Sequence, residues 1–192
     1  MRILYDIVHP ADVHFFNHAM AAQRERGDQI LVTSRAKDIA IPLLERLGIP
    51  HRVLTRQGRG AGGLFAELLT RDWRLLAAAR DFRPDILVAN NSPCVAHVGQ
   101  ILMRPSLIFD DTEIHRFNQW LYYPFVTEVH SPNCYRLQLG SKQRRYPGYH
   151  PLAYLHPARF TPDRDGHSPT GTNGGPKRVL LRFIHRGAMH DL

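Results

Sequence analysis

Hydrophobic and polar positions follow two alternating patterns along the first 130 residues. Short runs of Ile, Val and Leu predict buried strands, and the stretches between them, with apolar residues three or four apart, predict helices. The predicted strands are Arg2–Val8, Gln29–Thr33, His51–Leu54, Asp85–Ala89, Ser106–Phe109 and Phe125–Val129. The predicted helices are Asp12–Arg26, Ala36–Leu47, Leu64–Phe82, Pro93–Met103 and Ile114–Tyr123. This alternation indicates an α/β fold with a Rossmann-like, doubly wound parallel sheet.

Residues at the helix ends agree with these boundaries. Asp12 is placed to cap the first helix, and Gly27 is placed to end it. Ser92 and Pro93 suit the N-cap and the first turn of a later helix. We interpret Gln57–Gly63, which is rich in Gly and Arg, as a loop. It is not a nucleotide-binding P-loop, because it lacks the Lys-Ser/Thr pair of that motif.

The composition changes after about residue 160. Thr161–Pro176 is rich in Pro, Gly, Ser, Thr and Asp, which is typical of a linker. Arg178–Ile184 then predicts one more buried strand, with no helix after it. We therefore expect a Rossmann-like domain at residues 1–160, a linker at 161–176 and the start of an incomplete second α/β domain at 177–192.

The charge balance adds a preference for anionic partners. The chain has 192 residues, of which 43% are hydrophobic and 22% charged, and its net charge is +8. A globular surface of this kind attracts phosphorylated small molecules, anionic lipid headgroups or nucleic acid. Its positive residues are mostly scattered arginines that match no recognition motif, so we expect no specific nucleic-acid partner.

The expected location is the cytoplasm. The chain has two widely separated cysteines, no leader segment at its start and no apolar run long enough to span a bilayer. The aromatic stretch Trp120–Phe125 and the excess of arginine leave open a peripheral contact at the inner membrane face, with plain core packing as the alternative. The sequence does not predict an oligomeric state.

Candidate chemistry gathers where predicted strands end, because ligands of open parallel sheets bind outside the carboxyl ends of the strands. The loop after the first strand contains His9 and His14. An imidazole suits general-base catalysis, and the positive end of the helix dipole would disfavour a protonated ring at His14. The alternative is a strand-end cap at His9 and a half-buried ring at His14.

Two further strand ends carry polar residues. Asp110, Asp111 and Glu113 could bind a divalent cation or accept hydrogen bonds from sugar hydroxyls, although Thr112 or Asp111 could instead cap the next helix. The helix start at Ser92 could hold a phosphate or could simply be well capped. No His/Cys spacing predicts a metal site.

Several motifs, taken in chain order, resemble the domain-of-unknown-function family 354. They are DIVHPADVHFF from Asp6, SLIFDDTE from Ser106, RYPGYH from Arg145, LAYLHP from Leu152, and LLRF from Leu180 with His190-Asp191. That family is grouped with GT-B glycosyltransferases and non-hydrolysing UDP-sugar 2-epimerases, which implies two Rossmann-like domains facing each other across a cleft. The chain departs from the family pattern at Asp12 and at His185-Arg-Gly, and we expect most of a second domain to be missing.

The resemblance implies that this chain is the N-terminal part of a GT-B-type glycosyltransferase. Its partners would be a UDP-linked nucleotide sugar and a cell-envelope or polysaccharide acceptor, either a sugar or a lipid-linked sugar. His14 would deprotonate the acceptor hydroxyl without a metal or other cofactor, and Asp110, Asp111 and Glu113 would line the same cleft as catalytic residues. The implied substrate-binding residues are His9, Asp12, Asn91, Ser92, Tyr149, His150, His185 and His190.

Other functions stay open at this stage. A UDP-sugar 2-epimerase would use acidic and histidine side chains to move protons at the sugar ring, and it needs no second substrate. A non-catalytic module would bind a ligand or a membrane surface. Because the second domain of a GT-B enzyme supplies most of the nucleotide-sugar site, we expect this chain alone to be inactive.

Overall fold

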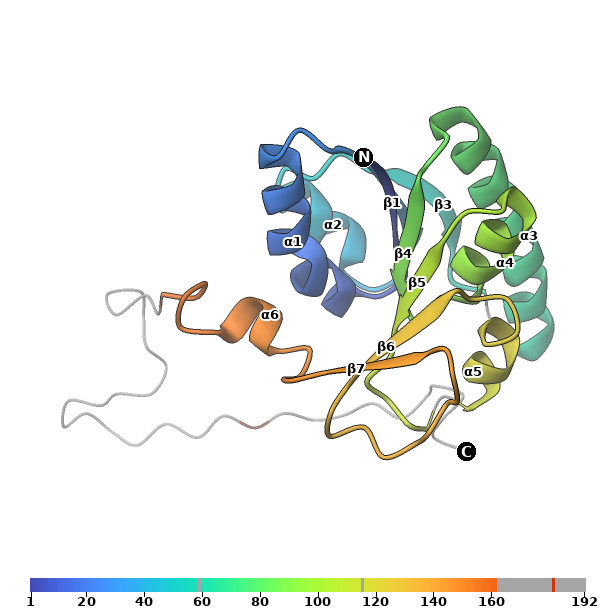
Figure 1. Cartoon of the computed structure of the whole chain (residues 1–192). Coiled ribbons are helices and arrows are strands. Elements are labelled where there is room, and N and C mark those ends of the chain that lie inside the picture. Colours follow the sequence, from blue (N-terminus) through green and yellow to red (C-terminus); the bar gives the residue numbers. More distant parts are fainter. Residues whose placement is uncertain (59, 115, 162–180, 182–192) are drawn as a thin grey trace.

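Seven parallel strands form one sheet in the order β3-β2-β1-β4-β5-β6-β7 (Figure 1). The computed structural model describes residues 1–58, 60–114, 116–161 and 181. The strands are β1 (Arg2–Ile7), β2 (Gln29–Ala36), β3 (Arg52–Arg56), β4 (Ile86–Asn90), β5 (Ser106–Phe109), β6 (Glu128–Pro132) and β7 (Gln143–Tyr146). The helices are α1 (Pro10–Glu25), α2 (Ala40–Arg46), α3 (Gly60–Phe82), α4 (Pro93–Leu102), α5 (Arg116–Tyr122) and α6 (Leu152–Leu155). The predicted α/β class is therefore confirmed.

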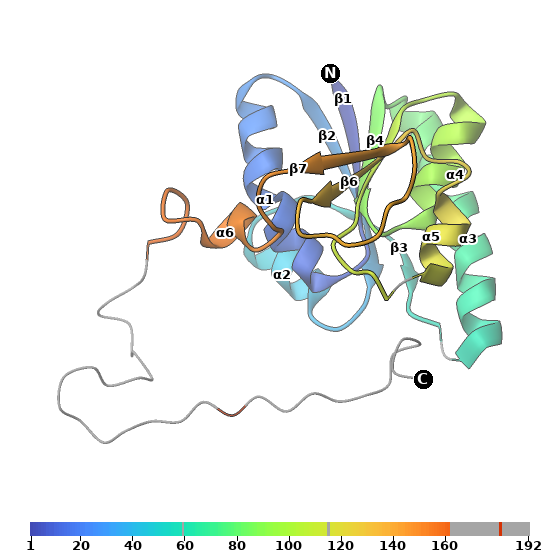
Figure 2. The ribbon, with the colours of Figure 1, turned by 60° about the horizontal axis from the view of Figure 1, so that its bottom comes forward.

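Helices cover both faces of the sheet, α1 and α2 on one side and α3, α4 and α5 on the other (Figures 1 and 2). Successive side chains of a strand point to opposite faces, so β1 contributes to two cores. Tyr5 and Ile7 pack with Phe16 of α1 on the first face. Leu4 packs with Leu75 of α3 on the second. Burial on both faces explains why the strand reads as a continuous apolar run in the sequence.

The strand order reverses at β1, which pairs with β2 on one side and β4 on the other. The chain leaves β1 toward α1 on one face and leaves β4 toward α4 on the opposite face. The carboxyl ends of β1 and β4 are therefore the switch point of the strand order, which is the usual ligand position in doubly wound sheets. The loops that carry His9 and Asn91 both begin at this point.

Several predicted boundaries were wrong. The N-cap of α1 is His9, and Asp12 is the N3 residue whose side chain completes the capping box. The helix α3 begins at Gly60, inside the predicted loop, and an added Cβ at Gly58 would meet the Gly63 carbonyl oxygen at 2.3 Å. This close backbone approach, which only glycine permits, folds the Gly-rich stretch back onto the helix start.

Two strands near the sheet edge also differ from prediction. The sixth strand is Glu128–Pro132 and not Phe125–Val129, because Tyr122 and Val126 instead fill the core between α4, α5 and the sheet. The edge strand β7 was missed, since its four residues Gln143–Tyr146 include two arginines and carry no apolar run. Charged residues are common on edge strands, where they discourage pairing with other chains.

The remaining domain predictions concern residues 161–192. Apart from Thr161 and Leu181, this stretch lies outside the described residues, and so do His185 and His190. Over the part of the chain that the structure describes, the helices are too short or too polar to cross a bilayer.

Candidate functional site

Asp12 connects the loop after β1 to the end of β4, where the strand order reverses. Its Oδ2 accepts hydrogen bonds from the backbone N–H groups of Val8 (3.0 Å) and His9 (2.8 Å), and its Oδ1 accepts one from Asn90 Nδ2 (2.9 Å). The side chain is buried. Asp12 therefore holds the loop after β1 against the end of β4, and it presents little surface to a ligand.

Burial raises the pKa of the Asp12 carboxyl from its ordinary value of 3.8 to about 6, against the opposing effect of the hydrogen bonds from Asn90, Val8 and His9. The folded chain therefore binds this proton more tightly than the unfolded chain does. We expect the free energy of unfolding to fall as pH rises from about 4 to about 6, by at most about 3 kcal/mol. Urea unfolding at a series of pH values measures this slope. Asp12→Asn is expected to flatten it, and an unchanged slope in that variant would contradict the assignment.

A buried ion pair lies between β1 and α3, on the α3 face of the sheet. Arg71 Nη2 of α3 donates to Asp6 Oδ1 of β1 at 2.5 Å, and both side chains are almost fully buried. Thr33 Oγ1 (2.7 Å) and Ser92 Oγ (2.9 Å) also donate to Asp6. Ser92 is the N-cap position of α4, as predicted, but its hydroxyl is used here and not by a ligand. Sequence reasoning missed this network, although a carboxylate inside an apolar strand signals that a buried partner exists.

A second ion pair continues the network toward β3. Arg35 at the end of β2 donates through Nε (2.6 Å) and Nη2 (2.5 Å) to the Glu67 carboxylate of α3. Thr55 Oγ1 and the Gly58 N–H also donate to Glu67. Desolvation raises the pKa of Glu67, but the hydrogen bonds from Arg35 and Gly58 outweigh it and leave the pKa lowered. These contacts hold the start of α3 against the sheet and leave no carboxylate there for catalysis.

Asp110 lies in the core, which corrects its expected position in the cleft. The side chain has no exposed surface. Its Oδ2 accepts hydrogen bonds from Tyr122 Oη (2.6 Å), Tyr135 Oη (3.1 Å) and Gln119 Nε2 (3.1 Å). The Thr112 N–H donates to Oδ1. Asp110 thus joins the end of β5 to α5 and to the segment after β6, and a substrate cannot reach it in this arrangement.

The neighbouring residue Asp111 is the accessible carboxylate of this strand end. Its Oδ2 lies 3.1 Å from His150 Nδ1, and its side chain is 36% exposed whereas that of His150 is 8% exposed. The His150 ring stacks on Phe15 of α1 with centroids 4.1 Å apart. Burial raises the pKa of Asp111, but the hydrogen bonds from His150 and Thr112 outweigh it and leave the pKa lowered. Asp111 is therefore an ionised hydrogen-bond acceptor, held in place by a packed histidine.

His14 lies on the second turn of α1 and is exposed. Its ring centroid is 5.4 Å from that of Tyr154 on α6, and α6 packs beside α1 (Figure 1). Because the adjacent residue Phe15 carries the stacked His150, the chain brings His14 and the Asp111–His150 pair to the same region. This arrangement leaves the His14 imidazole available to a ligand from solvent.

The other expected site residues have local structural partners. The His9 side chain accepts a hydrogen bond from the Ala11 N–H (3.2 Å) and so caps α1, which is the alternative left open above. Asn91 adopts φ +50° and its N–H donates to the Phe109 carbonyl. Glu113 accepts a hydrogen bond from the Arg136 N–H. Tyr149 is 55% exposed and lines the groove described next.

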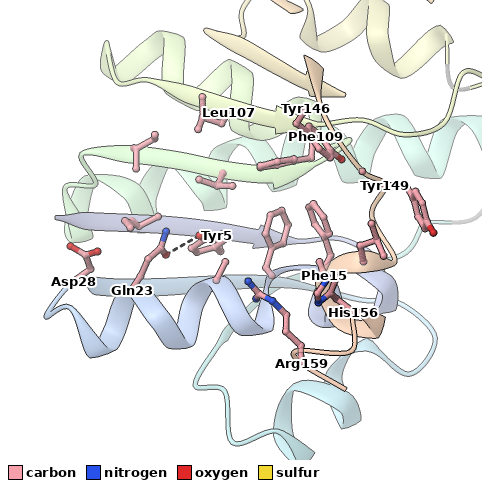
Figure 3. Close-up of a pocket in the computed structure, with 18 of the residues that line it drawn as sticks. Tyr5, Phe15, Gln23, Asp28, Leu107, Phe109, Tyr146, Tyr149, His156 and Arg159 are labelled. Atoms are coloured by element: carbon pink, nitrogen blue, oxygen red, sulfur yellow. Dashed lines mark hydrogen bonds between the residues drawn. The ribbon is translucent and has the colours of Figure 1, made fainter. Parts of the chain in front are cut away.

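A groove of about 930 Å³ runs along the α1 face of the sheet, over β1, β4 and β5. Its floor is apolar and aromatic, and Phe15, Phe109 and Tyr146 stand at the end nearer the carboxyl ends of the strands (Figure 3). Gln23 and Asp28 lie at the opposite end. The groove meets the Asp111–His150 pair, because Phe15 and Phe109 line it and both contact the His150 ring. Over the described residues, no three His, Cys, Asp or Glu side chains gather as metal ligands would.

No family model and no curated protein sequence matches the chain, so the resemblance to family 354 stays a prediction. Solved structures do match. MurG from Acinetobacter baumannii has a TM-score of 0.63 at 13% identity, over 76% of this chain and 45% of that one. UDP-GlcNAc 2-epimerase from Methanocaldococcus jannaschii has a TM-score of 0.57 at 13% identity, over 69% and 40%.

The glycosyltransferase SsfS6 from Streptomyces sp. SF2575, complexed with thymidine diphosphate, has a TM-score of 0.57 at 16% identity, over 76% of this chain and 52% of that one. The chain thus spans about half the length of these proteins or less. At such identities the likeness establishes the fold. The chain has the parallel, Rossmann-like architecture of one half of the GT-B glycosyltransferases and UDP-GlcNAc 2-epimerases.

Proposed function

We propose that residues 1–160 form the acceptor-binding half of a nucleotide-sugar-dependent glycosyltransferase. The observation that carries the proposal is the Asp111–His150 pair, an ionised and half-exposed carboxylate held by a buried histidine at the carboxyl end of β5. A fixed carboxylate is a strong acceptor for sugar hydroxyls. The adjoining apolar groove suits the apolar part of a lipid-linked sugar.

The exposed His14 is the proposed general base. Its imidazole would take the proton of an acceptor hydroxyl as that oxygen attacks the anomeric carbon of the donor sugar and the bond to the nucleoside diphosphate breaks. Asp111 would orient the acceptor by accepting a hydrogen bond from another hydroxyl. The similar structures include SsfS6 bound to thymidine diphosphate and the 2-epimerase of Neisseria meningitidis bound to UDP-GlcNAc, which supports a nucleotide sugar as donor.

Acceptor binding tests the proposal directly in this chain. An alkyl glucoside below its micelle concentration combines a sugar headgroup with an apolar tail, and we expect the chain to bind it in a calorimetric titration. Asp111→Asn is expected to weaken binding about tenfold, since it replaces a charge-assisted hydrogen bond by a neutral one. Glu113→Gln, a matched change two residues away, is expected to leave binding unchanged. Equal effects of the two substitutions would contradict the role of Asp111.

Turnover distinguishes a transferase from an epimerase. With an acceptor and UDP-GlcNAc or a thymidine diphosphate sugar present, transfer is measured as release of nucleoside diphosphate. If transfer occurs, His14→Gln is expected to lower its rate by about 10²- to 10⁴-fold, whereas His18→Gln, one turn later on α1, is not. Conversion of UDP-GlcNAc without acceptor would indicate an epimerase, and acceptor binding without turnover is the result expected of an isolated acceptor-binding half.

A further inference from the structure

Large apolar side chains are exposed on the outer surface of α3 and α5. Phe65, Leu69 and Trp73 follow one another at four-residue spacing on α3 and are 63%, 55% and 70% exposed. Phe117 and Trp120 on α5 are 60% and 73% exposed, and their rings lie 6.4 Å apart. Residues three or four apart share one face of a helix, so each set forms a continuous stripe. We call these five residues the α3–α5 face.

The helices that carry the two stripes are joined through α4. His97 of α4 contacts Asp72 Oδ2 of α3 through Nδ1 (2.9 Å) and the Leu121 carbonyl of α5 through Nε2 (3.1 Å). Trp73 directly follows Asp72, and Trp120 directly precedes Leu121. His97 of α4 therefore bridges α3 and α5 at the turns that carry the two tryptophans, and both views show α5 on the same side of the sheet as α3 (Figures 1 and 2).

Arginines outnumber carboxylates among the exposed charges of α3 and α5. The carboxylates of the two helices are Glu67, Asp72 and Asp81, and the exposed Asp81 lies 4.0 Å from Arg52. Glu67 is paired with Arg35, and Asp72 is paired with His97. The exposed charged residues of these helices are Arg74, Arg80, Asp81 and Arg116. An apolar, tryptophan-containing surface bordered mainly by arginine suits the interface of an anionic lipid bilayer.

We propose that the α3–α5 face is a docking surface for an anionic membrane. Tryptophan and phenylalanine partition into the region between headgroups and acyl chains, while arginine contacts lipid phosphates. Both helices follow parallel strands, so their first turns lie at the carboxyl edge of the sheet, the same edge as Asp111 and His14. Docking would thus hold that edge close to the lipid surface. The inference rests on the exposed residues and charges, independently of any transfer reaction.

The two tryptophans of the chain provide the test, since both belong to this face. The full chain is mixed with vesicles of phosphatidylcholine alone or of phosphatidylcholine with phosphatidylglycerol. With the anionic vesicles we expect co-sedimentation and a shift of tryptophan emission to shorter wavelength, both weakened by added salt. Leu69→Ser combined with Trp73→Ser is expected to weaken binding about tenfold or more, with Trp120 left as reporter.

Ile39→Ser is the matched control, because Ile39 is 65% exposed just before α2, on the opposite face of the sheet. It is expected to leave vesicle binding unchanged, and far-UV circular dichroism checks that all variants fold. No emission shift with anionic vesicles would overturn the proposal, and so would equal binding to neutral vesicles. A dimer that forms without lipid and shields both tryptophans, seen by analytical ultracentrifugation, would overturn it in favour of self-association.

Discussion

Replacing Arg71 by methionine is expected to lower the free energy of unfolding by about 3–5 kcal/mol. Among the described residues the guanidinium is the cation that pairs with Asp6, and Asp6 has no exposed surface. Methionine fills much of the same space but leaves the carboxylate buried with hydrogen bonds from Thr33 and Ser92 alone. Urea unfolding followed by circular dichroism measures the loss.

The double variant Asp6→Asn with Arg71→Met separates the ion pair from packing. Because it removes the buried charge as well, it is expected to be more stable than Arg71→Met alone. Arg80→Met, on the exposed side of the same helix, is expected to change stability by no more than about 0.5 kcal/mol. If Arg71→Met cost less than about 1 kcal/mol, the buried pair would not stabilise the fold as its geometry indicates.

Replacing Asp110 by alanine is expected to cost about 4 kcal/mol, whereas Asp111→Asn is expected to cost less than about 1 kcal/mol. The first change leaves the hydroxyls of Tyr122 and Tyr135 and the amide of Gln119 buried without their acceptor. The second keeps an oxygen that can accept a hydrogen bond from His150 at a half-exposed position. Thermal and urea unfolding of both variants measure the difference between adjacent residues.

The Asp110→Ala and Asp111→Asn variants also distinguish a carboxylate that stabilises the fold from one that binds a ligand. Asp111→Asn is expected to fold normally and to bind the alkyl glucoside about tenfold more weakly, since the ionised acceptor is lost. Tyr122→Phe, which removes one donor to Asp110, is expected to lie between Asp110→Ala and the unmodified chain, at about 1–2 kcal/mol. A similar loss of stability in the two aspartate variants would show that Asp111 is also part of the core.

Local patterns predicted the elements of the sheet well where burial is strong. The apolar run of β1 and the helical spacing of Val13, Phe16 and Met20 identify a strand and a helix without any other information. Prediction was wrong where tertiary contacts override a local signal. Val126 looks like part of a strand, but it lies before β6 begins and packs into the core with Tyr122 of α5. The charged edge strand β7 has no apolar signal at all.

The sequence indicated where in the fold to look for a site, but not which side chains are accessible there. The rule for parallel sheets drew attention to the carboxyl ends of β1, β4 and β5, and the structure places Asp12, Ser92 and Asp111 near those ends. It could not tell Asp110 from Asp111, because adjacent residues on a loop point in different directions that depend on the packing around them. The structure buries the first among tyrosines and leaves the second half-exposed beside His150.

By itself, the sequence determined the alternation of strands and helices, the parallel sheet and the edge at which polar residues gather. These properties follow from the spacing of apolar residues along the chain, which is a local quantity. Only the tertiary structure decided which polar side chains meet. Asp6 and Arg71 are 65 positions apart and Asp12 and Asn90 are 78 apart, so their pairing depends on strand order and helix placement. The tertiary structure also put the tryptophans of α3 and α5 on the same side of the sheet, because His97 of α4 joins Asp72 to the Leu121 carbonyl.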